Sequence, residues 1–202
     1  MKKNTRLHDG FTLVEVLVAI TLLLMVIVGP LQIIARTNNS TAFASEQMTA
    51  WFLAQEGLEL AQQARDGYLL NYFNNTTTHP WTDFVDPSGQ YGPCFKSTGC
   101  GLFVNNDGSV AVTDCGVFSC QLFQSTANTP ATRRASYIHV LASGSNPAQS
   151  TQSKFTRVVT LKETGSGREV AATSTVTWRT GSLIAGQKVE TATFLFNIYD
   201  KP

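Results

Sequence analysis

The chain has 202 residues, and its 15 Lys and Arg against 14 Asp and Glu give a formal net charge of +1. A nearly neutral chain has no electrostatic footprint for nucleic acid, so we expect no nucleic-acid partner. Only 14% of the residues are charged, and Thr, Ser, Asn and Gly are abundant after Gly67. This composition is typical of an exported, strand-rich domain, and the length allows one such domain besides a membrane helix.

The N-terminus combines a short basic leader with a long apolar segment. Residues 1–10 contain Lys2, Lys3 and Arg6, and the apolar segment that follows, residues 11–35, is interrupted by one charge, at Glu15. As a helix, about 25 residues span roughly 37 Å, which exceeds the ~30 Å hydrocarbon core of a membrane. We therefore expect a single membrane-spanning helix, with the basic leader in the cytoplasm and the rest of the chain outside it.

Glu15 is the unusual residue of this segment, because a carboxylate inside a membrane helix costs about 2.5–3.5 kcal/mol. A position near the membrane surface and near the positive helix N-terminus would relieve part of this cost. Cleavage after Gly10 would supply a partner, because Phe11 would then carry a free, positively charged amine. An ordinary secretory signal peptide cut after Ala44 is the alternative, but it would have a shorter apolar core without an acidic residue.

Residues 10–15, Gly-Phe-Thr-Leu-Val-Glu, resemble the prepilin signal that type IV pilins, minor pilins and type II secretion pseudopilins share. The resemblance implies that a prepilin peptidase cleaves between Gly10 and Phe11 and methylates the new N-terminus at Phe11. It also implies that Glu15 pairs with the N-terminus of a neighbouring subunit during assembly. The implied partners are this peptidase, other pilin or pseudopilin subunits, the inner-membrane assembly platform and the membrane itself.

Gly29 and Pro30 lie inside the apolar segment. Proline removes one backbone donor and crowds the preceding turn, so we expect a kink or local unwinding there. The simple alternative is that the helix accommodates both residues without any functional role, since membrane helices often contain glycine and proline. The resemblance adds that filament helices of this kind can melt locally near such residues when subunits pack.

Residues 36–67 predict an amphipathic helix that continues the span outward. Small and apolar residues recur on one face at helical spacing: Phe43, Ala50, Trp51, Ala54, Gly57, Leu58, Ala61 and Ala64. Glutamine and glutamate side chains occupy the opposite face, and Gly67 is placed as the C-terminal stop. Small residues permit close approach of a sheet or of neighbouring helices, so this face is expected to pack.

Residues 68–202 are expected to form the extracytoplasmic domain, with a loop-rich insertion over about 68–150. Residues 102–104 and 110–112 predict a hairpin, because they flank Asn-Asn-Asp-Gly-Ser, whose residues favour tight turns. A calcium loop is the alternative at this turn, but the ligand spacing of an EF-hand is missing.

Four cysteines lie in this insertion: Cys94, Cys100, Cys115 and Cys120. Outside the cytoplasm, disulfides are the expected state of these residues. The nearest-neighbour pairing, 94 with 100 and 115 with 120, is one of three possible connectivities, and the sequence does not choose among them. Zinc ligation is the alternative, although neither pair has the usual ligand spacing.

The C-terminal part predicts three successive antiparallel strands over residues 155–163, 170–179 and 188–199, which are rich in Val, Thr and aromatic residues. In the last strand, Phe194 and Phe196 alternate with Leu195. One face of the strands should pack against the amphipathic helix. The predicted fold is thus α+β, a long N-terminal helix on a C-terminal antiparallel sheet, which is also the pilin architecture.

The two histidines after the leader, His79 and His139, are not accompanied by a nucleophile motif, paired metal ligands or a phosphate-binding loop. We therefore expect no catalytic residue, cofactor or metal, and no enzymatic activity. The predicted function is that of a structural subunit, a minor pilin or pseudopilin, which moves from the inner membrane into a pilus or pseudopilus. The alternative is a membrane-anchored extracytoplasmic enzyme or binding domain with a fortuitous prepilin-like start.

Overall fold

The computed structural model describes residues 10–74, 79–105, 107–125, 137–139, 150–165, 167–180 and 186–198. The chain divides into two compact units, Met1–Ser45 and Glu46–Pro202. One helix, α1 (Leu13–Phe73), begins in the first unit and ends in the second. The second unit also contains the helix α2 (Pro80–Val85), the short 3-10 helix η1 (Gly92–Phe95) and the strands β1 (Cys100–Val104), β2 (Val110–Asp114), β3 (Gln121–Ser125), β4 (Tyr137–His139), β5 (Ser150–Glu163), β6 (Glu169–Trp178) and β7 (Gln187–Phe196).

The first unit consists of the N-terminal part of α1 and the residues that precede it. Its segment Leu13–Ile34 is long and apolar enough to cross a membrane, and it is the one such helix in the described ranges. The side chains of this segment are exposed, as expected of a helix that is surrounded by lipid or by other helices. The predicted apolar N-terminal helix is therefore confirmed, and its first helical residue is Leu13.

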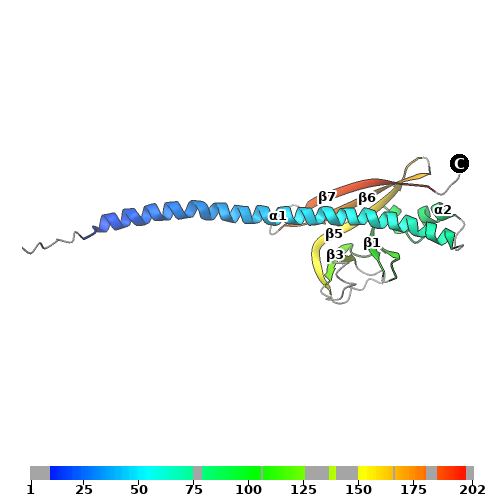
Figure 1. Ribbon diagram of the computed structural model, residues 1–202, viewed down its shortest axis with the longest axis horizontal. Helices are drawn as coiled ribbons and strands as arrows, with labels where there is room; N and C mark the ends of the chain where they lie inside the picture. Colours follow the sequence, from blue (N-terminus) through cyan, green and yellow to red (C-terminus); the bar gives the residue numbers. More distant parts are fainter. Residues whose placement is uncertain are drawn as a thin grey trace, which may run out of the picture. The chain divides into compact units, whose positions relative to one another are not determined.

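The second unit is built around one antiparallel sheet of seven strands. β5 is its central strand, because β6 pairs along one edge of it while β3 and β1 pair at successive positions along the other edge. β7 pairs with β6, and β2 and β4 pair with β1 and β3. Figure 1 shows β5 running between the β6–β7 side and the β1–β3 side of the sheet.

Both predicted groups of strands are confirmed. β1 and β2 form the expected hairpin, in which Val104 lies opposite Val110. β5, β6 and β7 form the expected C-terminal meander, although β5 begins at Ser150 rather than at Phe155. The additional residues of β5 have a partner, because β3 pairs with residues 150–156 of β5.

The predicted loop-rich insertion over residues 68–150 contains more regular structure than expected. The described residues of this region form two short helices and four strands, and these strands belong to the same sheet as the C-terminal meander. Each of the four strands has only three to five residues, and alternation over so short a run is difficult to distinguish from a loop. The region is therefore an integral part of the sheet.

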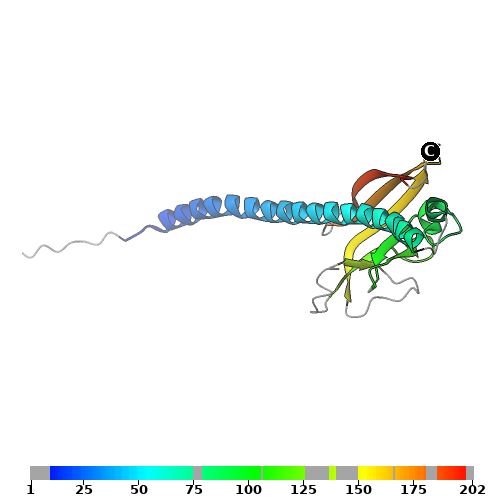
Figure 2. The same ribbon diagram turned by 45° about the vertical axis from the view of Figure 1, so that its right-hand side comes forward.

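Within the second unit, α1 packs its small-residue face against the sheet. The buried positions recur at helical spacing: Ala50, Leu53, Ala54, Gly57, Leu60, Ala61 and Ala64. Figure 2 shows the C-terminal part of α1 lying across the sheet, with α2 beside its end. At Gly57 the helix comes so close to β6 that a Cβ atom would overlap the Ser174 hydroxyl. The predicted packing of helix on sheet is therefore confirmed.

Trp51 is an exception to the predicted face. Its side chain is 48% exposed, whereas Leu53 and Leu60, which the prediction left off this face, are buried. Trp51 follows Ala50 and is rotated by about 100° from it, which places it on the flank of the packed stripe. The small residues determine which face approaches the sheet, because a bulky tryptophan would hold the helix further away.

Helix α1 does not stop at Gly67, as the sequence predicts, but continues to Phe73. Gly67 does not adopt the positive φ of a C-terminal cap. Beyond it, Tyr68 packs edge-on against Phe84 and Tyr91, with ring centroids 6.2 and 6.0 Å away. Such pairs contribute about 0.5–1.5 kcal/mol each beyond burial, which offsets the ~1 kcal/mol cost of a glycine inside a helix.

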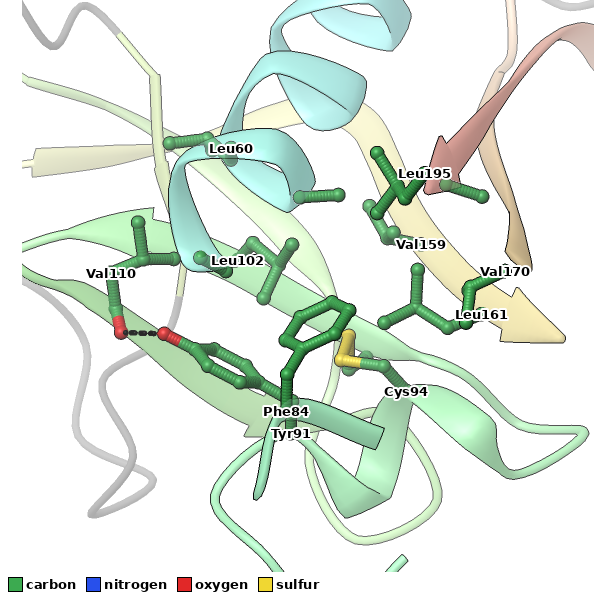
Figure 3. Close-up of a cluster of buried hydrophobic side chains, with 14 of the residues drawn as sticks. Leu60, Phe84, Tyr91, Cys94, Leu102, Val110, Val159, Leu161, Val170 and Leu195 are labelled. Atoms are coloured by element: carbon green, nitrogen blue, oxygen red, sulfur yellow. Dashed lines mark hydrogen bonds between the residues drawn. A yellow bond between two sulfur atoms is a disulfide. The ribbon is translucent and has the colours of Figure 1, made fainter. Parts of the chain in front are cut away.

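The main hydrophobic core of the second unit lies between α1, α2 and the sheet (Figure 3). Its members include Leu60 of α1, Phe84 of α2, Leu102 of β1, Val159 of β5 and Leu195 of β7. Tyr91 donates a hydrogen bond from its hydroxyl to the backbone oxygen of Val110, at 2.9 Å. Burial raises the pKa of the Tyr91 hydroxyl, which keeps it a neutral donor.

Candidate functional site

The predicted cleavage site lies directly ahead of the first turn of α1. Gly10, Phe11 and Thr12 are not helical, and the Phe11 side chain is 82% exposed. The backbone oxygen of Thr12 accepts the N–H of Val16 at 3.2 Å, and the Thr12 hydroxyl oxygen accepts the N–H of Glu15 at 3.3 Å. These contacts make Thr12 the N-cap of α1, so the peptide bond between Gly10 and Phe11 lies outside the helix.

Glu15 is the third residue of α1 and is exposed. In the first turn, its carboxylate is favoured by the positive end of the helix dipole. Among the described residues, no cation forms an ion pair with this carboxylate. Within the described residues, the Glu15 carboxylate is therefore exposed and has no ion-pair partner.

Threonine hydroxyl groups in the first unit donate hydrogen bonds to the backbone of their own helix. The Thr21 hydroxyl donates to the backbone oxygen of Val18 at 2.8 Å, and that of Thr37 donates to the backbone oxygen of Ile33 at 2.9 Å. Such bonds let threonine side chains lie in an apolar helix without a partner from elsewhere. Glu15 is the one charged residue in the span Leu13–Ile34.

Gly29 and Pro30 are helical like their neighbours. The local unwinding that the sequence allows at this point is not seen, since α1 is continuous from Leu13 to Phe73. A Cβ atom at Gly29 would meet no other group within 4 Å, so no packing contact within the chain requires a glycine here. A kink at Pro30 stays a prediction.

Residues 6–29 match a family model described as the prokaryotic N-terminal methylation motif. The chain carries the prepilin-type signal of type IV pilins and pseudopilins. This prepilin-type signal contains Gly10, Phe11 and Glu15, the residues for which the resemblance predicts roles in cleavage, methylation and assembly. No curated protein and no solved structure matches the chain at a significant level.

The four cysteines form two nearest-neighbour disulfides, Cys94–Cys100 and Cys115–Cys120. The structure thereby resolves the pairing that the sequence leaves open. Because all four sulfur atoms are in disulfide bonds, the cysteines are not zinc ligands in this structure. The first bond joins η1 to the start of β1, and the second spans the connection from β2 to β3. The disulfides thus brace the segments that lead into the two strands that pair with one edge of β5.

Arg157 of β5 connects the helix to the sheet. Its side chain is 1% exposed, and its Nη1 atom donates to the backbone oxygen of Leu53 at 3.1 Å and to Oε2 of Glu56 at 2.7 Å. Its Nη2 atom donates to the backbone oxygen of Leu102 in β1, at 3.0 Å. Burial lowers the pKa of Arg157, and the neighbouring Glu56 opposes that shift. One guanidinium therefore holds α1, β1 and β5 together.

The buried role of Arg157 was not predicted from the sequence, although a signal for it exists. Along β5, the side chains of Phe155, Val159 and Leu161 are buried, and strand alternation places Arg157 on the same side. A charged residue within an inward-facing apolar series is expected to be buried with a partner. Alternation could therefore have found Arg157, but it could not have identified Glu56 as its partner.

Glu46 makes a second polar connection between α1 and the sheet. Its carboxylate accepts hydrogen bonds from the Lys154 ammonium group and, at 2.5 Å, from the Thr180 hydroxyl. Burial raises the pKa of Glu46, but the bonds from Lys154 and Thr180 outweigh this effect, so the pKa lies below its ordinary value. The second unit therefore stabilises the ionised form of this carboxylate.

Proposed function

We propose that this protein is a structural subunit of a filament, either a minor pilin or pseudopilin of a type IV pilus or a type II secretion pseudopilus. The observation that carries the proposal is the prepilin-type signal over residues 6–29, at the start of an exposed apolar helix. The α+β second unit, a helix packed on an antiparallel sheet, supports it. In this role, a prepilin peptidase cleaves the precursor after Gly10 and methylates Phe11.

The precursor would be inserted in the plasma (inner) membrane by one span. Lys2, Lys3 and Arg6 favour a cytoplasmic N-terminus, which puts the second unit outside the cytoplasm. The two disulfides support this placement, because such bonds form and persist in oxidising compartments. The assembly platform would then move the processed subunit from the membrane into the filament.

Helix packing between subunits would satisfy two properties of the first unit. The apolar surface of Leu13–Ile34 is exposed and requires lipid or other helices around it. Glu15 requires a positive partner, and cleavage creates one as the amine of Phe11. We therefore infer that Glu15 pairs with the amine of a neighbouring subunit, because an unpaired carboxylate among packed apolar helices is strongly destabilising.

The second unit offers a further apolar surface for contacts between subunits. Met48, Trp51 and Phe52 lie on α1 and are 67%, 48% and 68% exposed. They are spaced as i, i+3 and i+4, so they form one patch on the helix surface, away from the stripe that packs on the sheet. Apolar anchors at this spacing are typical of helix–helix contacts, so we expect helices of neighbouring subunits to cover them.

A structural rather than enzymatic role is part of this proposal. In the structure, His79 precedes α2 and His139 ends β4. Among the residues that the structure describes, no three of the His, Cys, Asp and Glu side chains are grouped to hold a metal ion. The proposal therefore rests on processing and packing, and processing is the step that a direct measurement can test.

The test is mass spectrometry of the mature N-terminus in a host that has a prepilin peptidase. We expect a chain that starts with methylated Phe11, and in a peptidase-deficient host we expect the unprocessed precursor. A chain in the first host that keeps Met1, or that starts at Ser45 as a secretory signal would give, contradicts the proposal. The alternative of an anchored enzyme or binding domain with a fortuitous signal predicts one of these two results.

A further inference from the structure

Thr12 lies between the proposed cleavage site and the helix that follows it. Its backbone oxygen accepts the first helical hydrogen bond, from Val16, and its side-chain oxygen accepts the N–H of Glu15. We propose that Thr12 is a positioning residue for cleavage, which holds the peptide bond between Gly10 and Phe11 outside the helix, where a peptidase can bind it. This inference rests on the proposed function, because it concerns the cleavage step itself.

The Thr12 hydroxyl determines where α1 begins. The first N–H groups of a helix have no acceptor within it, and a side-chain oxygen at the N-cap satisfies one of them. Here the acceptor is Thr12 and the donor is Glu15 at the third helical position. Threonine followed three residues later by glutamate is also the sequence pattern of a capping box, which favours a helix start at this point.

Loss of this cap would favour a helix that starts further upstream. Asp9 is the next residue toward the N-terminus whose side chain can accept a capping hydrogen bond. A helix capped by Asp9 would include Gly10 and Phe11, and the oxygen of Gly10 would accept the N–H of Val14. The bond to be cleaved would then lie inside a helical turn and would have to unfold before it could be bound in extended form.

The position of the peptide bond between Gly10 and Phe11 affects the rate of its hydrolysis. Hydrolysis breaks the C–N bond between Gly10 and Phe11, adds the oxygen of water to the Gly10 carbonyl carbon and leaves the Phe11 nitrogen as a free amine. The observed rate depends on the fraction of chains in which this bond is accessible, since the inaccessible fraction reduces the apparent affinity of the peptidase. A residue that keeps the bond out of the helix therefore raises the rate without touching the reacting atoms.

The first test measures processing of the full-length precursor in membranes that contain the peptidase. Thr12→Val keeps the branched shape and removes the hydroxyl, and we expect it to slow cleavage by up to about five-fold, the typical effect of losing a cap. Thr12→Ser and Thr12→Asn both cap well and should be processed at the wild-type rate. Thr21→Val is the matched control, because it removes a hydroxyl that bonds within the span.

Thr12→Asn separates positioning from direct recognition of the hydroxyl by the peptidase. Asparagine restores the cap with an amide oxygen and has no hydroxyl. If Thr12→Asn is cleaved as slowly as Thr12→Val, the peptidase reads the hydroxyl and the positioning role is wrong. Rescue by asparagine supports the positioning role, because only the cap is common to the two side chains.

The second test follows hydrogen exchange in the full-length precursor without the peptidase. In the wild type, the N–H groups of Leu13 and Val14 have no acceptor within the helix and should exchange rapidly. In Thr12→Val, they should exchange several-fold more slowly, because a helix starting upstream supplies acceptors. Unchanged exchange there, or faster exchange at Val16, means that the helix does not extend and overturns the inference.

The two proposals fail in different ways. A wild-type precursor that stays uncleaved in the presence of the peptidase overturns the proposed function together with the role of Thr12. A wild-type precursor that is cleaved, beside a Thr12→Val precursor cleaved equally fast, overturns only the role of Thr12.

Discussion

Arg157 and Glu56 form an ion pair between residues 101 positions apart in the chain. The two partners differ in environment, since the side chain of Arg157 is 1% exposed and that of Glu56 is 41% exposed. Arg157 also donates to two backbone oxygens, whereas water can still reach the carboxylate of Glu56. The arginine is therefore expected to contribute more to stability than the glutamate.

We expect Arg157→Met to lower the free energy of unfolding of the second unit by about 2–4 kcal/mol, because it leaves two backbone oxygens without this donor. Glu56→Gln should lower it by only about 1 kcal/mol, since glutamine keeps an acceptor and the site is partly hydrated. All three tryptophans lie in the second unit, so tryptophan fluorescence during denaturant unfolding measures both variants. A larger loss for Glu56→Gln would contradict this order.

Glu46 predicts a specific dependence of stability on pH. Its pKa in the folded protein lies below the ordinary value of 4.5, so the folded state binds the Glu46 proton less readily than the unfolded chain does. The resulting stabilisation is present above pH 4.5 and is lost as the pH falls through the folded pKa. Glu46→Gln lacks this contribution, because its amide does not titrate.

The measurement compares the unfolding free energies of the wild type and Glu46→Gln at pH 7 and at pH 3. The difference between the two proteins should shrink at pH 3. Both proteins will lose stability in acid, because the pKa of Asp114, which accepts a hydrogen bond from Lys96, is also lowered. A constant difference across this range would show that Glu46 is not the titrating group.

At the scale of elements, Gly57 determines how closely α1 approaches β6. A Cβ atom there would overlap the hydroxyl of Ser174 and lie 3.2 Å from Cδ of Arg157. The Ser174 hydroxyl is buried and, within the described ranges, has no hydrogen-bond partner. Helix and sheet therefore meet where α1 has a glycine, Gly57, and β6 has a buried serine hydroxyl, Ser174, that lacks a hydrogen-bond partner among the described residues.

We expect Gly57→Ala to destabilise the second unit by about 1–2 kcal/mol, because overpacking exceeds the gain in helix propensity. Ser174→Ala should be nearly neutral or stabilising, since it removes an unpaired buried hydroxyl. In the double variant, part of the cost of Gly57→Ala should be recovered, and a double-mutant cycle of unfolding free energies measures this. Strict additivity would show that the two residues are not in contact.

The helix and the C-terminal strands could be predicted because their signals lie within a few consecutive residues. Strand β7 shows the limit of such signals. Alternation leaves open whether Leu195 or the aromatic pair Phe194 and Phe196 faces inward. The structure buries Leu195 opposite Val170 and leaves Phe194 and Phe196 about half exposed. Pairing with β6 decides the choice.

In the candidate site, too, local signals could be predicted and long-range contacts could not. Gly10, Phe11 and Glu15 could be predicted because the signal is contiguous in the sequence. The contacts of Arg157 could not, because they depend on which distant segments β5 brings together. The two disulfides join neighbouring cysteines, but four cysteines allow three connectivities, and the sequence does not choose among them. The C-terminal end of α1 was predicted at Gly67 rather than at Phe73, because Tyr68 contacts its partners Phe84 and Tyr91 only in the folded unit.

At the scale of the whole molecule, the first unit carries a helix long and apolar enough to cross a membrane, and the second carries the folded domain. Because these features lie in separate units, a change in one unit should leave the other intact. Glu15→Ala tests this separation, since Glu15 is the one charge in the span and has no described ion pair. Its removal should not hinder membrane insertion, because alanine is less costly in lipid than a carboxylate.

We expect Glu15→Ala to insert normally and to reduce incorporation into filaments by about ten-fold or more, because a buried charge pair between subunits is lost. Glu59→Ala is the matched control, since Glu59 is exposed on α1 in the second unit. Membrane fractionation measures insertion, and the amount of subunit in sheared filaments measures incorporation. Normal incorporation of Glu15→Ala would contradict the role of this residue in assembly.

The central position of β5 has a consequence for the order of events during synthesis. The hairpin of β1 and β2 needs only neighbouring residues, but β1, β3 and β6 acquire their shared partner only after residues 150–163 have been synthesised. Until then, the buried stripe of α1 has no sheet to cover it. A truncated chain that ends before Ser150 therefore cannot complete its core, because β1 and β3 would lack the strand with which both of them pair.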